Sequence, residues 1–342
     1  MHGGWFHDIG PWLIPALGIR WYGVAYLLGF VVGWVLLLKL SKRRLVLIPH
    51  ERADTLVMAV IVGVIAGGRL GYVLFYRPSL LWTTVDGFPW WGLLAINEGG
   101  MASHGGMIGV ILACVWYARR EKIPFLHIGD VAALLAPFGL LFGRIANFIN
   151  GELLGVVVAK PGEAAPWWSV RFPQELMERP TPEQQAQVLE IAREFGQGAE
   201  NSYDAAAWLV GAVQRGNPEV QALVEPIVSA RAPSQLLQAF MEGVVLLAVL
   251  WWIWRRPRRP GVVGAWFLMV YGAGRVLTEV WRLPDEHLSV GRPLGLSRGQ
   301  WLSVAMVGAG AALLWWVLRR SQREPVGGWL VQAEPETASI PS

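Results

Sequence analysis

The stretch LLAPFGLLFGRIANFINGE, residues 134 to 152, runs from an apolar segment that could lie in lipid into a cluster of polar side chains. Ionisable side chains inside a membrane span almost always face a protein interior or a water-filled cavity. At about 100° per residue, the first three polar positions fall within an arc of about 120° on one helix face. The stretch therefore predicts a membrane helix whose polar end lines a site. Its polar residues are Arg144, Asn147, Asn150 and Glu152.

The rest of the chain has the composition of a membrane protein. Of its 342 residues, 54% are hydrophobic, 16% are charged and 20 are Trp, which is unusual for a soluble domain. Apolar stretches of about 20 residues, the length that crosses a bilayer core of about 30 Å, recur along it. We therefore predict an all-α, polytopic membrane protein. The seven expected spans lie near 20–40, 55–76, 101–118, 128–149, 235–254, 262–281 and 299–318.

Basic clusters in the short loops predict the orientation, because such clusters stay on the cytoplasmic side. They follow the first, third, fifth and seventh expected spans. The N terminus is therefore expected outside and the C terminus in the cytoplasm, and the net charge of +4 needs no nucleic-acid partner. The first span lacks a basic leader and a small-residue cleavage site, so we interpret it as an uncleaved anchor. A single cysteine, Cys114, excludes an intramolecular disulfide.

One long polar interval, residues 156–232, predicts a mostly helical, extracytoplasmic arm. It separates residues 1–155, with four expected spans, from residues 233–320, with three. Residues 321–342 have no periodic apolar face and are expected to form a disordered cytoplasmic tail.

Helix signals recur within the arm. Thr181 with Gln184 three residues later forms a capping-box pattern, which predicts a helix start. Two further short helices are expected around 203–215 and 218–229.

Further polar side chains fall within the expected spans and are candidates for the same site. Each of these side chains could have a structural role instead of a role in the site. Glu279 could simply neutralise Arg275 or Arg282. Arg69 could extend to the interface, and the tyrosines could belong to an aromatic belt. Arg144 and Arg275 lie in glycine-flanked sequences, where helices approach closely. Two guanidiniums brought together favour an anion such as a lipid phosphate. The candidates are Tyr22, Tyr26, Arg69, Tyr72, Tyr76, Tyr271, Arg275, Glu279 and Arg282.

A histidine opens the third expected span, in MASHGGMIGV at residues 101–110. The two glycines after His104 suit a helix start at which a substrate comes close to the backbone. A structural, hydrogen-bonded histidine is the alternative. No H-E-x-x-H motif occurs and cysteine is nearly absent, so the sequence argues against a zinc site.

Five segments resemble the prolipoprotein diacylglyceryl transferase family, in order and at similar spacing. The resemblance covers most of residues 19–155 and 233–320, and GRIANFINGELLG is close to a signature of the family. It implies an enzyme without metal or organic cofactor, at the outer face of the cytoplasmic (inner) membrane. Such an enzyme moves the diacylglyceryl group of phosphatidylglycerol to the lipobox cysteine of a prolipoprotein and releases glycerol phosphate. The segments are IRWYGVAYLLGF, GGRLGYVLFY, GGMASHGGMIG, GRIANFINGELLG and YGAGRVLTEVWRLPD.

The resemblance implies a role for each candidate. A thiol with an ordinary pKa near 8.5 is mostly protonated at neutral pH, and His104 matches the residue type of a general base. Arg144 and Arg275 would bind the phosphate of the leaving group and stabilise its charge. Whether His104 or an arginine handles the proton stays open. The residues expected to bind the lipid head group or support the site are Tyr26, Asn147, Glu152, Gly155, Tyr271, Glu279 and Arg282.

The chain departs from the family before the fifth expected span. Where the family commonly reads H-P-S-Q-L-Y-E, residues 232–238 read APSQLLQ, so Ala232, Leu237 and Gln238 replace the histidine, tyrosine and glutamate. The arm also looks longer than usual. The alternative functions are an anion transporter, another phospholipid-binding membrane protein, or an intramembrane hydrolase. The sequence shows neither the inverted repeats of many transporters nor a G-x-S-G stretch or paired intramembrane aspartates.

Overall fold

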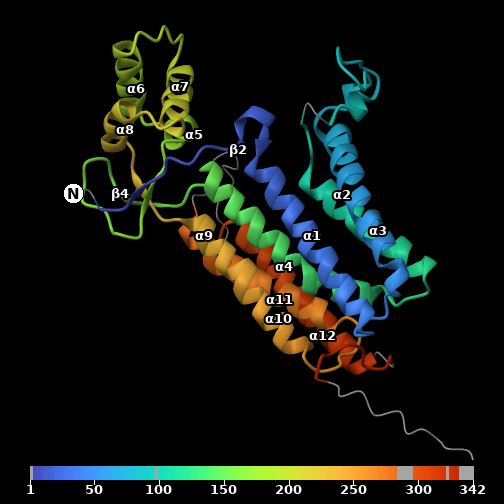
Figure 1. Cartoon of the computed structure of the whole chain (residues 1–342). Helices are drawn as coiled ribbons and strands as arrows, with labels where there is room; N and C mark the ends of the chain where they lie inside the picture. Colours follow the sequence, from blue (N-terminus) through green and yellow to red (C-terminus); the bar gives the residue numbers. More distant parts are fainter. Residues whose placement is uncertain (1–2, 97–98, 283–295, 321–322, 331–342) are drawn as a thin grey trace, which may run out of the picture. The chain divides into compact units, whose positions relative to one another are not determined.

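The computed structural model describes residues 3–96, 99–282, 296–320 and 323–330. This part of the chain is mostly helical (Figure 1). The longer helices are α1 (Trp21–Lys42), α2 (Ala53–Tyr76), α3 (Ser103–Arg120), α4 (Phe125–Asn150), α10 (Leu246–Trp254), α11 (Val262–Thr278) and α12 (Arg298–Arg320). The shorter ones are α5 (Glu175–Glu178), α6 (Pro182–Glu194), α7 (Ser202–Gln214), α8 (Pro218–Val224) and α9 (Ser234–Gln238).

Among the described residues, five helical segments are long and apolar enough to cross a membrane. They coincide with five of the expected spans, which confirms a polytopic membrane protein. Most of the expected spans 101–118 and 262–281 is also helical, in α3 and α11, but the total of seven stays a prediction. The five segments are Trp21–Lys42, His50–Tyr76, Phe125–Asn150, Ser234–Trp254 and Gly299–Arg319.

The chain forms two compact units. The first comprises Met1–Val31, Ala136–Val249 and Leu268–Ala309. The second comprises Val32–Leu135, Leu250–Phe267 and Gly310–Ser342. Helices α1, α4, α10, α11 and α12 each contribute residues to both units.

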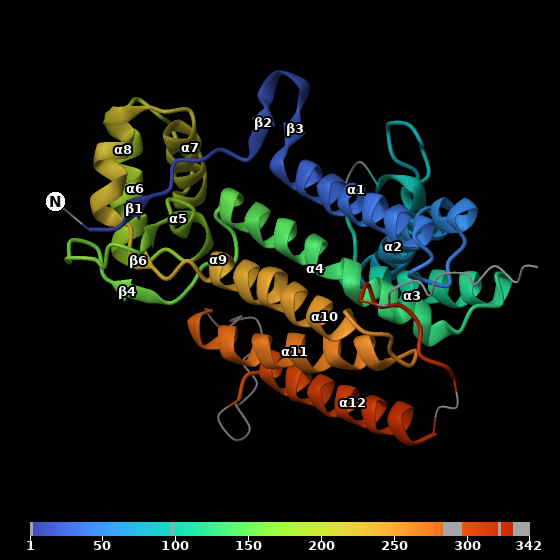
Figure 2. The same ribbon diagram turned by 60° about the horizontal axis from the view of Figure 1, so that its bottom comes forward.

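In the second unit, α2 packs against α3 along a line of glycines (Figures 1 and 2). A Cβ atom on Gly67 would collide with the carbonyl oxygen of Gly105, and one on Gly71 would lie 2.8 Å from the Gly105 Cα atom. Small residues at i and i+4 spacing let two helix backbones approach this closely. The absence of side chains at these glycines therefore allows the close packing of α2 and α3.

In the first unit, α11 lies beside α12 (Figure 2). A Cβ atom on Gly272 would lie 2.8 Å from the carbonyl oxygen of Ser303, so glycine again permits the approach. A four-stranded sheet in the order β1-β5-β6-β4 also belongs to the described part of this unit. Its strands are β1 (Trp5–Phe6), β4 (Val157–Ala159), β5 (Val170–Arg171) and β6 (Ala230–Arg231).

The arm has its own hydrophobic core, built by α5 to α8 (Figure 1). Thr181 caps α6: its hydroxyl accepts from the Gln184 backbone at 3.2 Å, and the Gln184 side chain accepts from the Thr181 backbone at 2.8 Å. This confirms the expected capping box. Helices α7 and α8 confirm the two further helices, although α8 ends at Val224. Phe6 of β1 joins this core, so the N-terminal strand belongs to the arm, which the sequence did not predict.

The described part of the tail is packed, where we expected disorder. Val326 forms a β-bridge with Arg258, and its N–H donates to the Arg258 carbonyl at 2.8 Å. The Trp329 ring lies 5.2 Å from that of Trp251 and 5.5 Å from that of Trp254. These contacts join segments that lie far apart in the sequence and have no helical periodicity, so no local pattern predicts them. Residues 321–322 and 331–342 lie outside the described residues.

Candidate functional site

The end of α4 carries a hydrogen-bonded chain of polar side chains. Gly151, at φ +67°, takes the left-handed conformation that ends the helix. The Asn147 amide donates to the Tyr22 hydroxyl at 2.7 Å, and that hydroxyl donates to Glu152 Oε2 at 3.0 Å. The Asn150 amide donates to Glu152 Oε1 at 3.2 Å. The structure thus brings together the predicted residues Asn147 and Glu152, with Tyr22 of α1 between them.

Two predicted arginines, Arg144 of α4 and Arg275 of α11, share a carboxylate. Arg144 Nε lies 3.0 Å from Glu242 Oε2, and Arg275 NH1 lies 3.3 Å from Glu242 Oε1. The Glu242 side chain is 0% exposed, whereas those of Arg144 and Arg275 are 19% and 13% exposed. A charged ligand can therefore reach the arginines but not the carboxylate between them.

Sequence reasoning missed Glu242, although a signal was present. It is the only ionisable residue in the expected span 235–254. An isolated carboxylate in an apolar span needs a buried cation as a partner, and this rule alone would have selected it.

Glu279 continues the cluster from the end of α11. It lies 3.2 Å from Arg275 NH2 and 3.9 Å from Arg282 NH1, so it neutralises both arginines, as the structural interpretation expected. The Ser297 hydroxyl donates to the other carboxylate oxygen of Glu279, Oε1, at 3.3 Å. Tyr271, also on α11, interacts electrostatically with Glu242, Arg275 and Arg144. The predicted residues Tyr271, Glu279 and Arg282 thus belong to one cluster with the two arginines.

Gly155 lies where three backbone segments meet. It forms a β-bridge with Arg282, and its carbonyl accepts from Arg231 NH1 at 3.0 Å. A Cβ atom at this position would collide with the carbonyl oxygen of Ala232. Gly155 therefore has a packing role, which fits the expectation that it positions the loop.

The three residues expected to depart from the family pattern lie just before α9 or within it. Ala232 is buried against Gly155, and Gln238 is buried on α9. Leu237 is partly exposed. Their neighbour Gln235 donates to the Glu152 carbonyl at 2.6 Å, so α9 still holds the loop after α4.

Tyr26 contacts this cluster only through an aromatic neighbour in the described structure. Its ring stacks on that of Tyr22 at 5.8 Å, and its side chain is 59% exposed. Its exposed ring is thus joined to the chain of polar groups through Tyr22.

His104 belongs to the second unit, as the second residue of α3. Its side chain is exposed, and no hydrogen bond to the imidazole is found among the described residues. Gly105 is buried against Gly67 and Gly71 of α2, so this glycine serves helix packing, where we expected an approach of substrate to the backbone. His104 thus lies in the second unit, whereas Arg144 and Arg275 lie in the first.

Arg69 is not a free cation near the interface. It is 5% exposed, and its guanidinium donates to the carbonyls of Gly92, Leu93, Gly99 and Gly100. The guanidinium is therefore bound by loop backbone within the protein. These bonds hold the loop that precedes α3. Ala102, the last residue before α3, also donates its N–H to the Gly68 carbonyl at 2.9 Å, which ties the same loop to α2. Tyr72 and Tyr76 stack on one another at 5.9 Å.

Two titratable groups near the end of α4 but outside the spans have shifted pKa values. His7 is buried and its Nε2 lies 2.9 Å from the Phe148 carbonyl, which requires the Nε2–H tautomer. Burial lowers the pKa of His7, and Asp8 partly opposes this. Burial raises the pKa of Glu178, and the negative charge of Glu152 raises it further.

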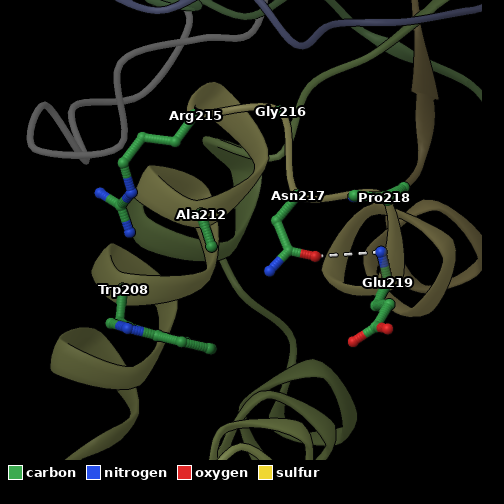
Figure 3. A pocket seen from close by; sticks show the side chains of 7 residues that line it. All are labelled: Trp208, Ala212, Arg215, Gly216, Asn217, Pro218 and Glu219. Atoms are coloured by element: carbon green, nitrogen blue, oxygen red, sulfur yellow. Dashed lines mark hydrogen bonds between the residues drawn. The ribbon is translucent and has the colours of Figure 1, made fainter.

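A cavity of about 490 Å³ lies in the arm between α7 and α8 (Figure 3). The Asn217 side chain, which accepts from the Glu219 backbone at 3.0 Å, forms part of its wall. The cavity contains none of the predicted site residues. Among the described residues, no group of three or more His, Cys, Asp or Glu side chains could hold a metal ion. The lining residues of the cavity are Trp208, Ala212, Arg215, Gly216, Asn217, Pro218 and Glu219.

Comparison with known proteins identifies one family. The sequence model described as prolipoprotein diacylglyceryl transferase matches residues 11–316. A protein of Bdellovibrio bacteriovorus, named phosphatidylglycerol–prolipoprotein diacylglyceryl transferase, is 38% identical over 345 aligned residues, covering 94% of this chain and 96% of its own. Proteins of the same name from Burkholderia mallei and Burkholderia thailandensis are 38% and 37% identical, each covering 89% of this chain and 92% of their own.

Proposed function

The chain belongs to the prolipoprotein diacylglyceryl transferase family, and from that premise we propose how this integral membrane transferase acts in lipoprotein maturation. It takes the diacylglyceryl group of phosphatidylglycerol and places it on the sulfhydryl of a lipobox cysteine. The cysteine sulfur forms a bond to the glyceryl carbon, and the bond from that carbon to the phosphate oxygen breaks. Glycerol phosphate leaves with the bonding electrons, and the thiol proton goes to a base on the enzyme.

The observation that carries this proposal is the pair of partly exposed arginines. Arg144 and Arg275 are held together by Glu242, and Arg282 joins them through Glu279. Arg144 and Arg275 keep partly exposed guanidiniums beside these carboxylates. A phosphodiester carries one negative charge and suits such a cluster, because arginine matches phosphate in both charge and geometry.

Neighbouring groups support the binding of a lipid head group. Asn147, Tyr22 and Glu152 offer hydroxyl, amide and carboxylate groups at the end of α4. Polar groups at membrane depth are tolerated where they line a cavity. The exposed ring of Tyr26 suits the glyceryl or acyl part of the lipid, and Gly155, Tyr271 and Glu279 hold the surrounding elements.

His104 is the proposed general base. Its imidazole is exposed, and a thiol must lose its proton before it becomes a good nucleophile. This role requires the second unit to present His104 to the same substrate that the arginines bind. A positioning role for His104 would instead give a loss of rate that does not depend on pH.

We propose that the protein lies in the cytoplasmic (inner) membrane with seven spans, counting α3 and α11. The basic loops place the N terminus outside and the C terminus in the cytoplasm. The arm and the end of α4 then lie at the outer leaflet, where an exported prolipoprotein arrives. The partners are phosphatidylglycerol and the lipobox region of a prolipoprotein, and the chemistry needs no cofactor.

The test incubates the protein with phosphatidylglycerol and a peptide that carries a lipobox cysteine. Mass spectrometry then measures transfer to the peptide. The peptide should gain one diacylglyceryl group, and a Cys→Ser peptide should gain none. Arg144→Ala and Arg275→Ala should each lower the rate of transfer by about 100-fold or more, while the protein still folds and inserts. Near wild-type turnover in either variant would remove the phosphate-binding role. No observation favours the transporter or hydrolase alternatives.

A further inference from the structure

Glu242 lies in an unusual element. The segment Ala239–Val245, between α9 and α10, is a π-helix. Such turns are rare in α-helical spans and occur often at functional sites, because the extra residue re-aims the side chains around it. The element places the only ionisable side chain of its span inward, at the two arginines.

The packing next to Glu242 brings it within reach of α4. A Cβ atom on Gly243 would lie 2.7 Å from the Leu141 Cβ atom of α4, so glycine allows this close contact. Leu141 and Arg144 are three residues apart and share a face of α4. The close approach at Gly243 therefore sets the short distance between Glu242 and Arg144.

Burial separates the role of Glu242 from that of the arginines. Its carboxylate is fully buried and accepts from Arg144 Nε and from Arg275 NH1, one through each oxygen. The two bonds use one nitrogen of each guanidinium. Arg275 NH2 also donates to Glu279, and the remaining N–H groups can bind other partners. Without a carboxylate between them, the two cations would repel one another in a poorly screened site.

We propose that Glu242 is a positioning residue that sets the spacing and the net charge of the arginine pair. The inference rests on the proposed function. With one buried negative charge between the arginines, the pair holds a singly charged phosphodiester yet still releases the product. Glycerol phosphate is a phosphate monoester and carries up to two negative charges near neutral pH, since its second pKa is about 6. A more positive pair would retain it.

The test compares Glu242→Gln with Glu242→Asp. Glu242→Gln keeps the size of the side chain and removes its charge, so glycerol phosphate should bind about 10-fold more tightly. At saturating phosphatidylglycerol, kcat should fall about 10-fold because release becomes slow, whereas KM should not rise. Glu242→Asp keeps the charge, so glycerol phosphate affinity should stay within about 2-fold of wild type while kcat recovers in part.

Glu175→Gln is the matched control. Glu175 is also buried in the first unit and pairs with Arg231 at 2.7 Å. Among the described residues, its other partners are Gln184 and Ser229, so its contacts do not include Arg144 or Arg275. This variant should lower the melting temperature without changing glycerol phosphate affinity. A general effect of breaking a buried ion pair is thereby distinguished from the effect proposed for Glu242.

Binding of glycerol phosphate is measured by calorimetry on the detergent-solubilised full chain, so the test does not depend on transfer. Tighter binding in Glu242→Gln but not in Glu242→Asp supports the inference even if wild-type transfer fails. Unchanged or weaker binding in a folded Glu242→Gln protein overturns it, whatever happens to kcat. If Glu242→Gln does not fold, Glu242→Asp decides: a change in glycerol phosphate affinity above about 10-fold, with the charge retained, contradicts the proposed role.

Discussion

At the residue scale, arginines within the expected spans differ in burial and in the partners that they bind. The guanidinium of Arg69 is surrounded by backbone carbonyls, whereas Arg144 and Arg275 share a carboxylate and remain partly exposed. The sequence predicted correctly that these side chains face the protein interior, since lipid would not tolerate them. It could not predict the partner of each, because the partners lie far along the chain or on loop backbone.

Arg69→Lys should destabilise the protein without affecting anion binding. A lysine has three donors on a flexible stem and cannot satisfy carbonyls on both sides of the loop, so buried acceptors lose their partners. We expect a loss of about 2 kcal/mol in the free energy of unfolding, seen as a lower melting temperature in detergent. Arg20→Lys, at an exposed position over the Trp12 ring, is the control and should leave stability nearly unchanged. Weaker glycerol phosphate binding in Arg69→Lys would show that Arg69 belongs to the anion site.

His7 should make stability depend on pH. Its folded pKa is lowered by burial, so the unfolded chain takes up the proton first as the pH falls. The stabilising contribution is therefore complete above about pH 6.5 and is lost as the pH falls toward the folded pKa, with a slope of at most about 1.4 kcal/mol per pH unit.

The measurement is the melting temperature of wild type and His7→Gln between pH 7.5 and pH 5.5. The wild type should lose more stability over this interval than the variant. Equal losses in both proteins would mean that His7 is not the group responsible. Because the comparison is a difference between two proteins, it removes the opposite contribution of Glu178, whose raised pKa adds stability at low pH.

At the element scale, the long helices could be predicted and the short strands could not. Hydrophobic length alone located five of the expected spans, and the Thr181 capping box located α6. The two-residue strands β1 and β6 form only because they pair with distant segments, and no local pattern marks them. No local pattern marked the π-helix at Ala239–Val245 either, and it contacts α4 at Gly243.

The pair α2 and α3 offers a direct test of the His-Gly-Gly stretch. In Gly105→Ala, the new methyl group would collide with the carbonyl of Gly67, which cannot move aside as a side chain can. We expect a loss of about 2 kcal/mol or more in stability and slower transfer, because α3 carries His104. In Gly106→Ala the nearest atom, the Val64 carbonyl oxygen, is 3.6 Å away, so the melting temperature should hardly change.

The two variants also separate packing from substrate access. If the glycines served only to admit substrate, Gly106→Ala would lose transfer at unchanged melting temperature, and Gly105→Ala would remain stable. That pattern would contradict the packing role given to Gly105.

At the scale of the whole molecule, the proposed chemistry draws on both compact units. The arginine cluster and the polar end of α4 belong to the first unit, and His104 belongs to the second. The sequence could assign these residues to one function through their order and spacing.

Glycerol phosphate release from phosphatidylglycerol, with and without a peptide that carries a lipobox cysteine, tests the central claim most directly. The purified full chain should release glycerol phosphate only when the peptide has a free thiol, and in equal amount to the lipid-modified peptide formed. Release at the same rate without the peptide, or with its cysteine replaced by serine, would contradict the account and indicate hydrolysis of the lipid instead of transfer.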